Sequence, residues 1–560
     1  MRKLILTLTI VLPGLSVPAN VLTPDQALQR LSQAGISKLP SASSYKLVNT
    51  TEGDTGATAY VFNSENNGFI ILSADDCACP VLGYADNGIF DSQNIPCGMT
   101  TWLDFYSRQI DEARAVGLIT PWRKSSSQIT DRESLSPALT TQWSQGEPYN
   151  NLCPMHNDKR CVTGCVATAM AQVLNLYRYS THGNGSHSYI WTHIEDGQIL
   201  SEELTLDFSE VEFDWDNMLD SYSENYTEEE ANAVAQLMYA CGVAVNMKYN
   251  HNASSAVANF VSYSLWQYFD YNSGAQCVQR DSWKEKGITW DDFVYEQLQQ
   301  HGAVLYNGIT SAEEGHAFVC DGYSEDGYFH FNWGWNGVSD GYFRLDALNP
   351  EVQGTGGSSA SLAFNYNQNI IAFLDPNDNG GEFLPPISGR DENFNITNKS
   401  VELGGKFTVA GWIVNESQLD YDLEFGCLLT DSEYGTEGEV ISVMDFTLPS
   451  CEAKTIYKKA QFPTEIADGF YCIRPVITWE GLGRWWTLPW NVKKDHVWVE
   501  VKDGTAYFNV DPGNSGIQGI HEIKSHLPYY LNLQGVKVED PQPGETYIKI
   551  TGTKATKIIF

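Results

Sequence analysis

Basic residues are scarce in this sequence. The 560-residue chain has 34 Lys and Arg residues against 70 Asp and Glu residues, and its formal net charge is −36. A surface of this sign repels phosphate backbones, which argues against nucleic acid as a partner. Long apolar runs are also missing, because no segment after the first 20 residues approaches the roughly 20 apolar residues of a membrane-spanning helix. The composition therefore predicts a globular chain with no membrane span.

Cysteines are few as well. The 12 cysteines are irregularly spaced, which excludes the dense disulfide framework of a small secreted scaffold. Several stand in strand-like apolar runs such as "AFVCDGY" and "YCIRPVI", a setting typical of buried thiols. No internal repeat of solenoid length is present. The sequence leaves the disulfide pairing open.

Shifts in composition divide the chain into five segments. The first, "MRKLILTLTIVLPGLSVPA", joins two basic residues to an apolar run that ends in small residues, as secretory signals do. The polar stretch "WRKSSSQITDRES" indicates a linker open to proteases. We expect a signal peptide at 1–19, an α+β unit at 20–125, a larger α+β unit at 126–376, a β-sandwich at 386–510 and a small β segment at 511–560.

The unit at 126–376 changes its periodicity halfway. Helical patterns dominate its first half, including 165–178 and a helix that Thr227 and Glu230 start as a capping box. Strand patterns dominate its second half, in "AVLYNG", "HAFVCDGY" and "YFHFNW". Helices separated in this way from an antiparallel sheet predict an α+β fold. From 386 onward, short alternating strands with polar turns are typical of a β-sandwich.

The stretch "TGCVATAMAQ" places Cys165 between a glycine and the start of an apolar helix. Free N–H groups and the dipole at a helix N-terminus favour a thiolate, which is the nucleophilic form of cysteine. Gly164 leaves room for a substrate carbonyl to approach the backbone. A core position is the other interpretation of Cys165, because cysteine is among the most often buried residues.

A cysteine nucleophile needs a base. His316 opens the apolar strand of "GHAFVCDGY", and Asn332 follows on the next strand. A cysteine followed by a histidine roughly 130–150 residues later is the order of papain-like proteases. His301 and His330 are weaker candidates, since one ends a helix pattern and the other alternates with aromatic core residues.

Acyl transfer also needs hydrogen-bond donors for the oxyanion. The backbone N–H of Cys165 is one donor, and a glutamine side chain is a natural second. The stretch "TTQWSQGEPYN" offers Gln142 and Gln145, and the residues alone do not decide between them.

A zinc site is the rival interpretation of this region. The spacing C-x2-H-x4-C-x3-C of Cys153, His156, Cys161 and Cys165 is compatible with zinc ligands. A zinc site would leave the glycine–histidine strand and the "NWGW" strand without an explanation.

Three long motifs, "TGCVATAMAQ", "GHAFVCDGY" and "FHFNWGWNGVSDGYFRLDALNP", resemble the streptopain family of papain-like bacterial cysteine peptidases. The stretch "GFIILSADD" resembles the inhibitory propeptide of that family. The resemblance implies an inhibitory propeptide at 20–125 and a papain-like cysteine peptidase domain at 126–376. It implies Cys165 as nucleophile, His316 as base and Gln145 as the oxyanion side chain. Asn332 is at the position of the residue that orients the histidine, but papain-like enzymes have Asn-Ser-Trp-Gly where this chain has "NWGW", which leaves Trp333 or Trp335 as the alternative for shielding or orienting His316. Further substrate-pocket candidates are Gly164, Trp333 and Trp335.

The same resemblance carries the functional expectations. We expect a cysteine endopeptidase made as a zymogen, with protein or peptide substrates, its own propeptide as inhibitor, and no metal or organic cofactor. The tail "YYLNLQGVKVEDPQPGETYIKITGTKATKIIF" resembles C-terminal sorting segments, so a secreted or cell-surface bacterial protein is expected. We also expect the sandwich at 386–510 to be immunoglobulin-like. The alternative is an inactive peptidase scaffold that serves as a surface binding protein.

Overall fold

The computed structural model describes most of the chain. The described residues are 21–36, 38–65, 67–117, 122, 132–195, 197–280, 289–309, 315–347, 368–376, 383–389, 394–431, 435–488 and 496–510, with the backbone of 529–531, 537–538, 546–551 and 554–559. The expected signal peptide at 1–19 lies outside them. Two compact units are present, and the first comprises Met1–Asp281, Trp290–Pro386 and Asn415–Leu419. Within the described part of the chain, every helix is too short or too polar to cross a bilayer.

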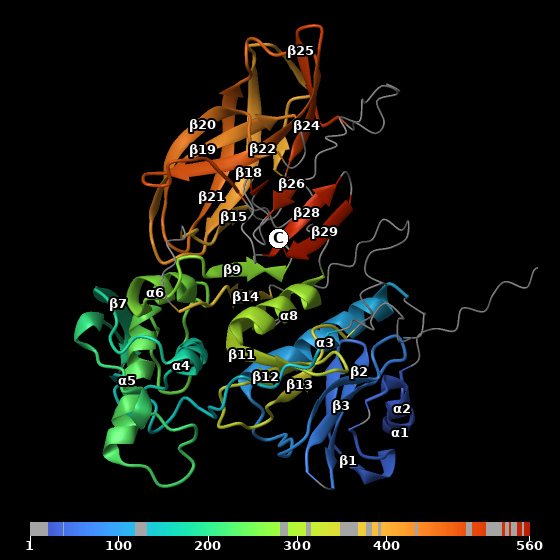
Figure 1. Ribbon diagram of the computed structural model, residues 1–560, viewed down its shortest axis with the longest axis vertical. Helices are drawn as coiled ribbons and strands as arrows, with labels where there is room; N and C mark the ends of the chain where they lie inside the picture. The colour runs from blue at the N-terminus through green and yellow to red at the C-terminus, as the bar shows by residue number, and fades with distance from the viewer. Residues whose placement is uncertain are drawn as a thin grey trace, which may run out of the picture. The chain divides into compact units, whose positions relative to one another are not determined.

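A ten-stranded antiparallel sheet organises the first unit, in the order β1-β2-β3-β4-β13-β12-β11-β10-β14-β9 (Figure 1). Its strands are β1 (Tyr45–Gly53), β2 (Gly56–Ser64), β3 (Phe69–Ser73), β4 (Val81–Ala85), β9 (Gln276–Gln279), β10 (Val304–Ile309), β11 (Gly315–Tyr323), β12 (Phe329–Asn332), β13 (Gly341–Phe343) and β14 (Asn369–Ala372). Strand β4 pairs with β13 through Tyr84 opposite Tyr342. The N-terminal segment and the larger segment that follows it therefore share one sheet.

Among the described residues of this unit, the helices are short apart from three of more than 12 residues. They are α1 (Pro24–Gln29), α2 (Leu31–Ala34), α3 (Cys97–Ala115), α4 (Cys165–Tyr177), α5 (Glu228–Ala244), α6 (Phe260–Phe269) and α8 (Trp290–His301), with 3-10 turns η1 (Ala42–Ser44), η3 (Phe208–Glu210) and η4 (Trp215–Asn217). The predicted capping box at the start of α5 is confirmed. Thr227 accepts from the Glu230 N–H at 3.2 Å, and the Glu230 carboxylate accepts from the Thr227 N–H at 2.6 Å.

Helices α3 and α4 lie on opposite faces of the sheet. Trp102 of α3 packs edge-on against Tyr306 and Phe318, with ring centroids 5.4 and 5.8 Å apart. Their chain neighbours Leu305 and Val319 belong instead to the core that contains α4 and α5. Because successive strand residues point to opposite faces, this alternation separates the two helices. Figure 1 shows α3 running beside strands of both the N-terminal and the larger segment.

Two hairpins complete the first unit: β5 (Met155–His156) with β6 (Lys159–Arg160), and β7 (Ser186–Glu195) with β8 (Gln198–Asp207). The first unit is thus a mixed α and β structure. Most of its described helices gather in the segment before β10, and six of the ten sheet strands follow from β9 onward.

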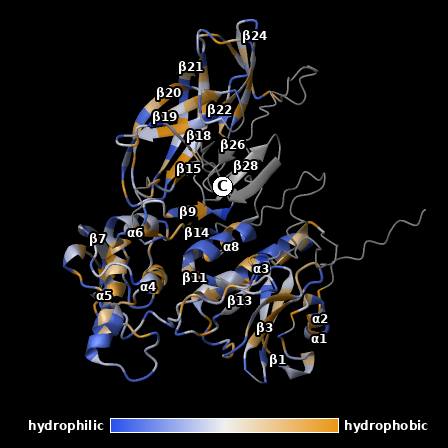
Figure 2. Ribbon diagram, viewed as in Figure 1, coloured by the Kyte–Doolittle hydropathy of each residue, from blue (hydrophilic) through white to orange (hydrophobic). Residues whose placement is uncertain are grey.

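The second unit is built from strands. These are β15 (Ile387–Gly389), β16 (Asn395–Ile396), β17 (Ser400–Glu402), β18 (Lys406–Asn415), β19 (Tyr421–Thr430), β20 (Glu439–Leu448), β21 (Ala453–Gln461), β22 (Gly469–Trp479), β23 (Trp486–Thr487), β24 (Val497–Lys502) and β25 (Thr505–Phe508). They form a four-stranded and a seven-stranded sheet around a shared core that includes Phe407 and Phe425. Hydrophobic and hydrophilic residues intermix along these strands in Figure 2. An immunoglobulin-like arrangement stays a prediction.

A third small sheet is formed near the end of the chain. Its strands are β26 (Tyr529–Leu531), β27 (Lys537–Val538), β28 (Thr546–Thr551) and β29 (Lys554–Ile559), in the order β27-β26-β28-β29. The strand–turn–strand pattern of the tail is typical of such a sheet.

Candidate active site

Cys165 is the first residue of α4, and Gly164 is its N-cap. Gly164 has φ +87° and ψ 147°, a conformation that is almost confined to glycine. A methyl group placed on Gly164 would lie 2.8 Å from Met247 Sδ and 3.1 Å from the Ser254 carbonyl oxygen. No side chain caps the helix, so backbone N–H groups of the first turn are left for a ligand or for the Cys165 sulfur.

The Cys165 sulfur lies where α4 meets β11. Burial raises the pKa of the thiol, while hydrogen bonds from the backbone N–H groups of Ala317, Val166 and Cys165 itself lower it. The helix start was expected to favour a thiolate, and its N–H groups do act in that direction. Burial outweighs them in this full-length form, so the net direction of the pKa shift corrects that expectation.

His316 comes immediately before Ala317, whose backbone lies near enough to the Cys165 sulfur to lower the pKa of its thiol. It is the second residue of β11, it is partly exposed, and it pairs with Gly308 of β10. Pairing with β10 fixes the backbone of His316, and α4 packs against the face of β11 to which Ala317 and Val319 belong. The fold therefore brings Cys165 and the backbone of His316 together, although 151 positions separate them in the chain.

The two candidate glutamines occupy different places. The Gln145 carbonyl accepts from the Thr163 N–H at 3.1 Å, which fixes Gln145 beside the chain that leads into Cys165. The Gln142 side chain lies against Gly337, where an added methyl group would come within 2.9 Å of its Cδ. Gln145 is thus held beside the start of α4, whereas the Gln142 side chain packs against the turn at Gly337.

Asn332 is buried and held by three hydrogen bonds. Its side-chain oxygen accepts from Gln172 Nε2 at 3.1 Å and from the Gly334 N–H at 3.0 Å, and its amide nitrogen donates to the Thr141 carbonyl at 2.8 Å. An asparagine that orients a histidine must accept from an imidazole N–H. Both lone pairs of the Asn332 oxygen are already engaged, so this geometry favours a framework role over the expected orienting role.

The two tryptophans differ in exposure. Trp333 is 2% exposed, and its indole N–H donates to the Ser339 carbonyl at 2.8 Å. A methyl group on Gly98 would lie 2.9 Å from the Trp333 ring, so the N-terminal segment covers this ring. Trp333 is therefore covered while the N-terminal segment is in place, and its role in a substrate pocket stays a prediction. Trp335 is partly exposed.

Comparison with known proteins identifies the family. A model of the peptidase C10 family matches residues 143–343, and a model of the Spi protease inhibitor matches residues 19–110. Streptopain of Streptococcus pyogenes is 31% identical over 332 residues, which cover 58% of this chain and 82% of streptopain. The chain belongs to the peptidase C10 family.

Two further proteins are similar to this chain. The thiol protease/hemagglutinin PrtT of Porphyromonas gingivalis is 30% identical over 383 residues, which cover 66% of this chain and 43% of PrtT. A solved fragment of prointerpain A from Prevotella intermedia is 34% identical, covers 58% of this chain and 97% of the fragment, and has a TM-score of 0.48. This C10 peptidase is a cysteine peptidase, and its N-terminal segment is similar to a protease inhibitor, as in a zymogen. The predicted resemblance to the streptopain family is confirmed.

The zinc motif does not form a ligand set in this C10 peptidase. Cys153 and Cys161 flank the β5–β6 hairpin, while His156 contacts the Ile194 carbonyl at 2.9 Å through Nε2 and His251 Nδ1 at 3.2 Å through Nδ1. The Cys165 sulfur faces β11 instead. No group of three or more His, Cys, Asp or Glu side chains suited to a metal ion occurs among the described residues.

The weaker histidine candidates have other partners. His301 Nδ1 lies 2.7 Å from Asp375, and His330 Nδ1 lies 2.6 Å from Asp321. Burial lowers the pKa of His330, but the hydrogen bond and charge of Asp321 outweigh it and raise that pKa. Asp340 accepts from the Trp333 N–H at 2.9 Å, and burial raises its pKa to about 7. Sequence reasoning missed Asp340, for which the motif "GVSDGYF" carries no special signal.

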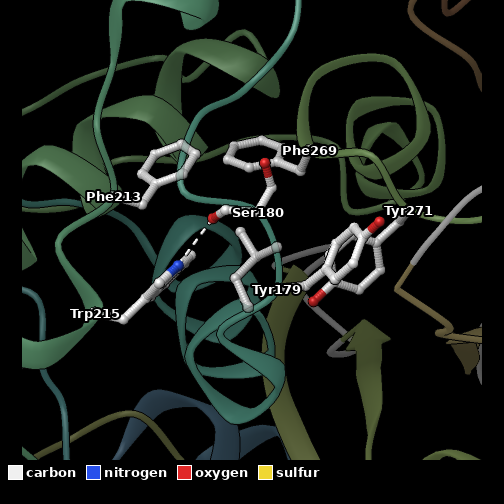
Figure 3. Close-up of a pocket in the computed structure, with 7 residues that line it drawn as sticks. Tyr179, Ser180, Phe213, Trp215, Phe269 and Tyr271 are labelled. Atoms are coloured by element: carbon white, nitrogen blue, oxygen red, sulfur yellow. Dashed lines mark hydrogen bonds between the residues drawn. The ribbon is translucent and has the colours of Figure 1, made fainter.

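An aromatic cavity lies at the opposite end of α4. Figure 3 shows Phe213, Trp215, Phe269 and Tyr271 around it, with the Trp215 N–H donating to the Ser180 carbonyl at 2.8 Å. Leu174 also lines it, nine residues after Cys165. At 1.5 Å per residue this places the cavity about 14 Å along the helix from Cys165. It is therefore separate from the nucleophile candidate.

Proposed function

We propose that the protein is a secreted cysteine endopeptidase, made as a zymogen, in which Cys165 attacks the peptide carbonyl and His316 transfers the proton. The observation that carries the proposal is the packing of α4 against the face of β11 that holds Ala317 and Val319, where the Ala317 backbone lies near enough to the Cys165 sulfur to lower the pKa of its thiol. It places the residue after His316 near the sulfur. A nucleophile and a base must approach within hydrogen-bond reach, and we propose that the His316 side chain reaches Cys165 in the active enzyme from the strand position next to Ala317.

The reaction follows from these positions. His316 takes the proton of Cys165, and the thiolate attacks the carbonyl carbon of the scissile bond. The oxyanion accepts from the Cys165 backbone N–H and from the Gln145 side chain, which the Thr163–Gln145 hydrogen bond holds beside α4. His316 then protonates the leaving amine, and water hydrolyses the thioester to release the acid and restore the thiol. No step draws on a metal or an organic cofactor.

Latency is supported by the pKa of the nucleophile. Burial raises the pKa of Cys165 in the full-length chain, so the reactive thiolate is disfavoured at neutral pH. Strand β4 extends the sheet at β13, and Gly98 of α3 lies on Trp333. Removal of residues 20–125 would expose Trp333 and the β13 edge of the sheet to water. We therefore propose that this segment is the inhibitory propeptide.

The remaining segments extend the proposal. Protein or peptide substrates and the chain's own propeptide are the proposed partners. The first 19 residues would direct export, and the tail after 510 would direct sorting at the bacterial surface. For the core at 126–376 we propose a papain-like arrangement, and for 386–510 an immunoglobulin-like sandwich, supported by its two sheets around one core.

Casein hydrolysis under reducing conditions tests the proposal. Wild-type protein should cleave casein after maturation, and Cys165→Ala and His316→Ala should each lose at least about 1,000-fold in rate, because nucleophile and base act as one unit. Cys451→Ala is the matched control, since Cys451 is an exposed thiol in the second unit and its loss should leave the rate unchanged.

The same experiment separates the alternative function. An inactive peptidase scaffold that binds a partner would show no hydrolysis, and a thiol-directed peptidase inhibitor would label Cys165 no faster than Cys451. Hydrolysis by Cys165→Ala at the wild-type rate would contradict the proposed nucleophile.

A further inference from the structure

Gln172 lies in the buried interior of the first unit, on the helix that carries the candidate nucleophile. It stands seven positions after Cys165 on α4, a spacing of about two helical turns. The two residues therefore lie on the same face of the helix. The Gln172 side chain is fully buried, and a buried amide is costly unless its oxygen and its nitrogen find hydrogen-bond partners.

Both ends of the Gln172 amide bind other segments of the chain. The nitrogen Nε2 donates to the Asn332 side-chain oxygen at 3.1 Å. The oxygen Oε1 accepts from the Thr141 hydroxyl at 2.9 Å and from the Trp143 N–H at 3.5 Å. The Asn332 amide nitrogen closes a triangle, because it donates to the Thr141 carbonyl at 2.8 Å. Helix α4, the end of β12 and the segment Thr141–Trp143 are thus joined at one point by side-chain hydrogen bonds.

Each of the joined elements leads to a group of the proposed mechanism. Helix α4 begins at Cys165, and the segment that Gln172 binds continues directly to Gln145. Strand β12 ends at Asn332 and pairs with β11, the strand that contains His316. The Gln172 amide therefore connects the elements that support the proposed nucleophile, oxyanion side chain and base.

An amide side chain is costly at this position in the core. The neighbouring residues Met170, Val173 and Leu174 belong to the apolar cluster around α4. A methionine in place of Gln172 would fill a similar volume without the cost of burying an amide. Hydrogen bonds fix distance and direction, whereas apolar packing tolerates small shifts. The polar side chain therefore suits a role in which the separation of these elements matters.

We propose that Gln172 is a positioning residue of the peptidase reaction, which holds the segment before Gln145 at a fixed place relative to the nucleophile helix. This inference rests on the proposed function, with Cys165 as nucleophile and Gln145 as oxyanion donor. Because Gln172 is buried, it acts through Gln145 and not on the substrate. An oxyanion donor stabilises the tetrahedral intermediate only when it lies where the negative charge develops.

Gln172→Met tests the proposal, because methionine keeps the length of the side chain and removes both hydrogen-bonding groups. Removing an oxyanion donor costs about 100–1,000-fold in kcat, and Gln172→Met leaves Gln145 present but less well placed. Mature Gln172→Met enzyme should therefore lose about tenfold in kcat for a peptide substrate, with KM within about threefold of wild type.

A double variant keeps the test independent of folding. Methionine leaves the Thr141 hydroxyl without the acceptor that Gln172 provides, and an orphaned buried hydroxyl destabilises the protein. Thr141→Val/Gln172→Met removes both partners together and should recover stability while keeping the loss in kcat. Urea unfolding of both variants in a Cys165→Ala background measures the stability.

Two reagents for the Cys165 sulfur distinguish positioning from a general structural role. In a peptide aldehyde the sulfur adds to the carbonyl carbon, the thiol proton passes to the oxygen, and that oxygen occupies the oxyanion site. Iodoacetamide alkylates the same sulfur with loss of iodide and forms no oxyanion. Gln172→Met should weaken aldehyde inhibition about tenfold and leave the alkylation rate within about twofold of wild type.

Gln297→Met is the matched control. Gln297 is also buried, and its side-chain oxygen accepts from the Phe373 N–H at 2.8 Å. It lies on α8, which carries no group of the proposed mechanism. This variant should lower the urea midpoint and leave both the aldehyde affinity and the alkylation rate within about twofold of wild type.

Two results would overturn the inference. One is wild-type kcat and aldehyde affinity in Gln172→Met and in the double variant. The other is an equal loss in aldehyde affinity and alkylation rate, which would show a general structural role. If either occurs while wild-type enzyme hydrolyses casein and Cys165→Ala does not, the positioning role is refuted and the proposed function stands. Absence of hydrolysis by mature wild-type enzyme would refute the proposed function itself.

Discussion

Replacing Gly164 with alanine should damage both the stability of the precursor and its activity after maturation. Alanine at φ +87° and ψ 147° costs about 1–3 kcal/mol, because this backbone region is almost confined to glycine. The new methyl group would lie 2.8 Å from Met247 Sδ and 3.1 Å from the Ser254 carbonyl. Met247 can bend away, but the backbone carbonyl cannot move freely, which adds about 1–3 kcal/mol of overpacking.

Gly56→Ala is the matched control. Gly56 also has a positive φ, of +113°, but nothing lies within 4 Å of a methyl group placed there. It therefore measures the backbone cost without the clash. Urea unfolding of both variants, followed by tryptophan fluorescence in a Cys165→Ala background that prevents self-cleavage, should show the larger loss for Gly164→Ala.

Activity provides the second measurement. Relief of the clash must shift Gly164 and the first turn of α4, which carries the nucleophile. A misplacement of about 1 Å costs roughly 100-fold in rate, so mature Gly164→Ala enzyme should lose about that factor in kcat/KM for a peptide substrate. Unfolding midpoints that match for Gly164→Ala and Gly56→Ala, together with an activity within threefold of wild type, would refute this reasoning.

Three further predictions concern maturation, pH and specificity. The Cys165→Ala precursor should accumulate uncut, and active enzyme should trim it in trans between Lys124 and Arg132, because Arg132 is held by an ion pair with Asp292 of the peptidase segment. N-terminal sequencing of the trimmed protein checks the cut site, and self-maturation of the variant at the wild-type rate would contradict the prediction. Asp340→Asn should raise the urea midpoint at pH 8 and leave it unchanged at pH 4. The pKa of Asp340 is about 7 in the folded protein against 3.8 in the unfolded chain, so the ionised Asp340 destabilises the fold as pH rises through that interval. An equal gain at both pH values would argue against this prediction. A peptide library should show a preference for Ile or Val two positions before the scissile bond, as the family resemblance implies, and a dominant requirement for Arg or Lys next to the bond would reject this.

The structure shortens the segment of the linker in which self-cleavage is expected. The composition of the polar linker "WRKSSSQITDRES" predicts self-cleavage between about Lys124 and Leu135, and residues 124–131 of that window lie outside the described residues. Leu135 exchanges two backbone hydrogen bonds of 2.8 Å with Tyr323. A protease needs an extended, accessible backbone, so the end of the window nearest Leu135 is the less favourable part.

Local signals in the sequence determined several helix starts and strands of this protein. The capping box at Thr227, the glycine before Cys165 and the alternation in "GHAFVCDGY" each act over a few residues, so their structures follow from short-range sterics and hydrogen bonds. The order of the long motifs was also sufficient for family membership. These features needed no knowledge of how distant segments pack.

Only the tertiary structure decided what surrounds the nucleophile candidate. Asn332 binds Gln172 and Thr141 because β12 turns that side chain toward α4, and no local pattern records this choice. Gly98 covers Trp333 because β4 joins β13 and α3 packs across the shared sheet. Contacts of this kind depend on the packing of segments that are far apart in the chain, and burial among them reverses the pKa shift that the start of α4 alone would produce.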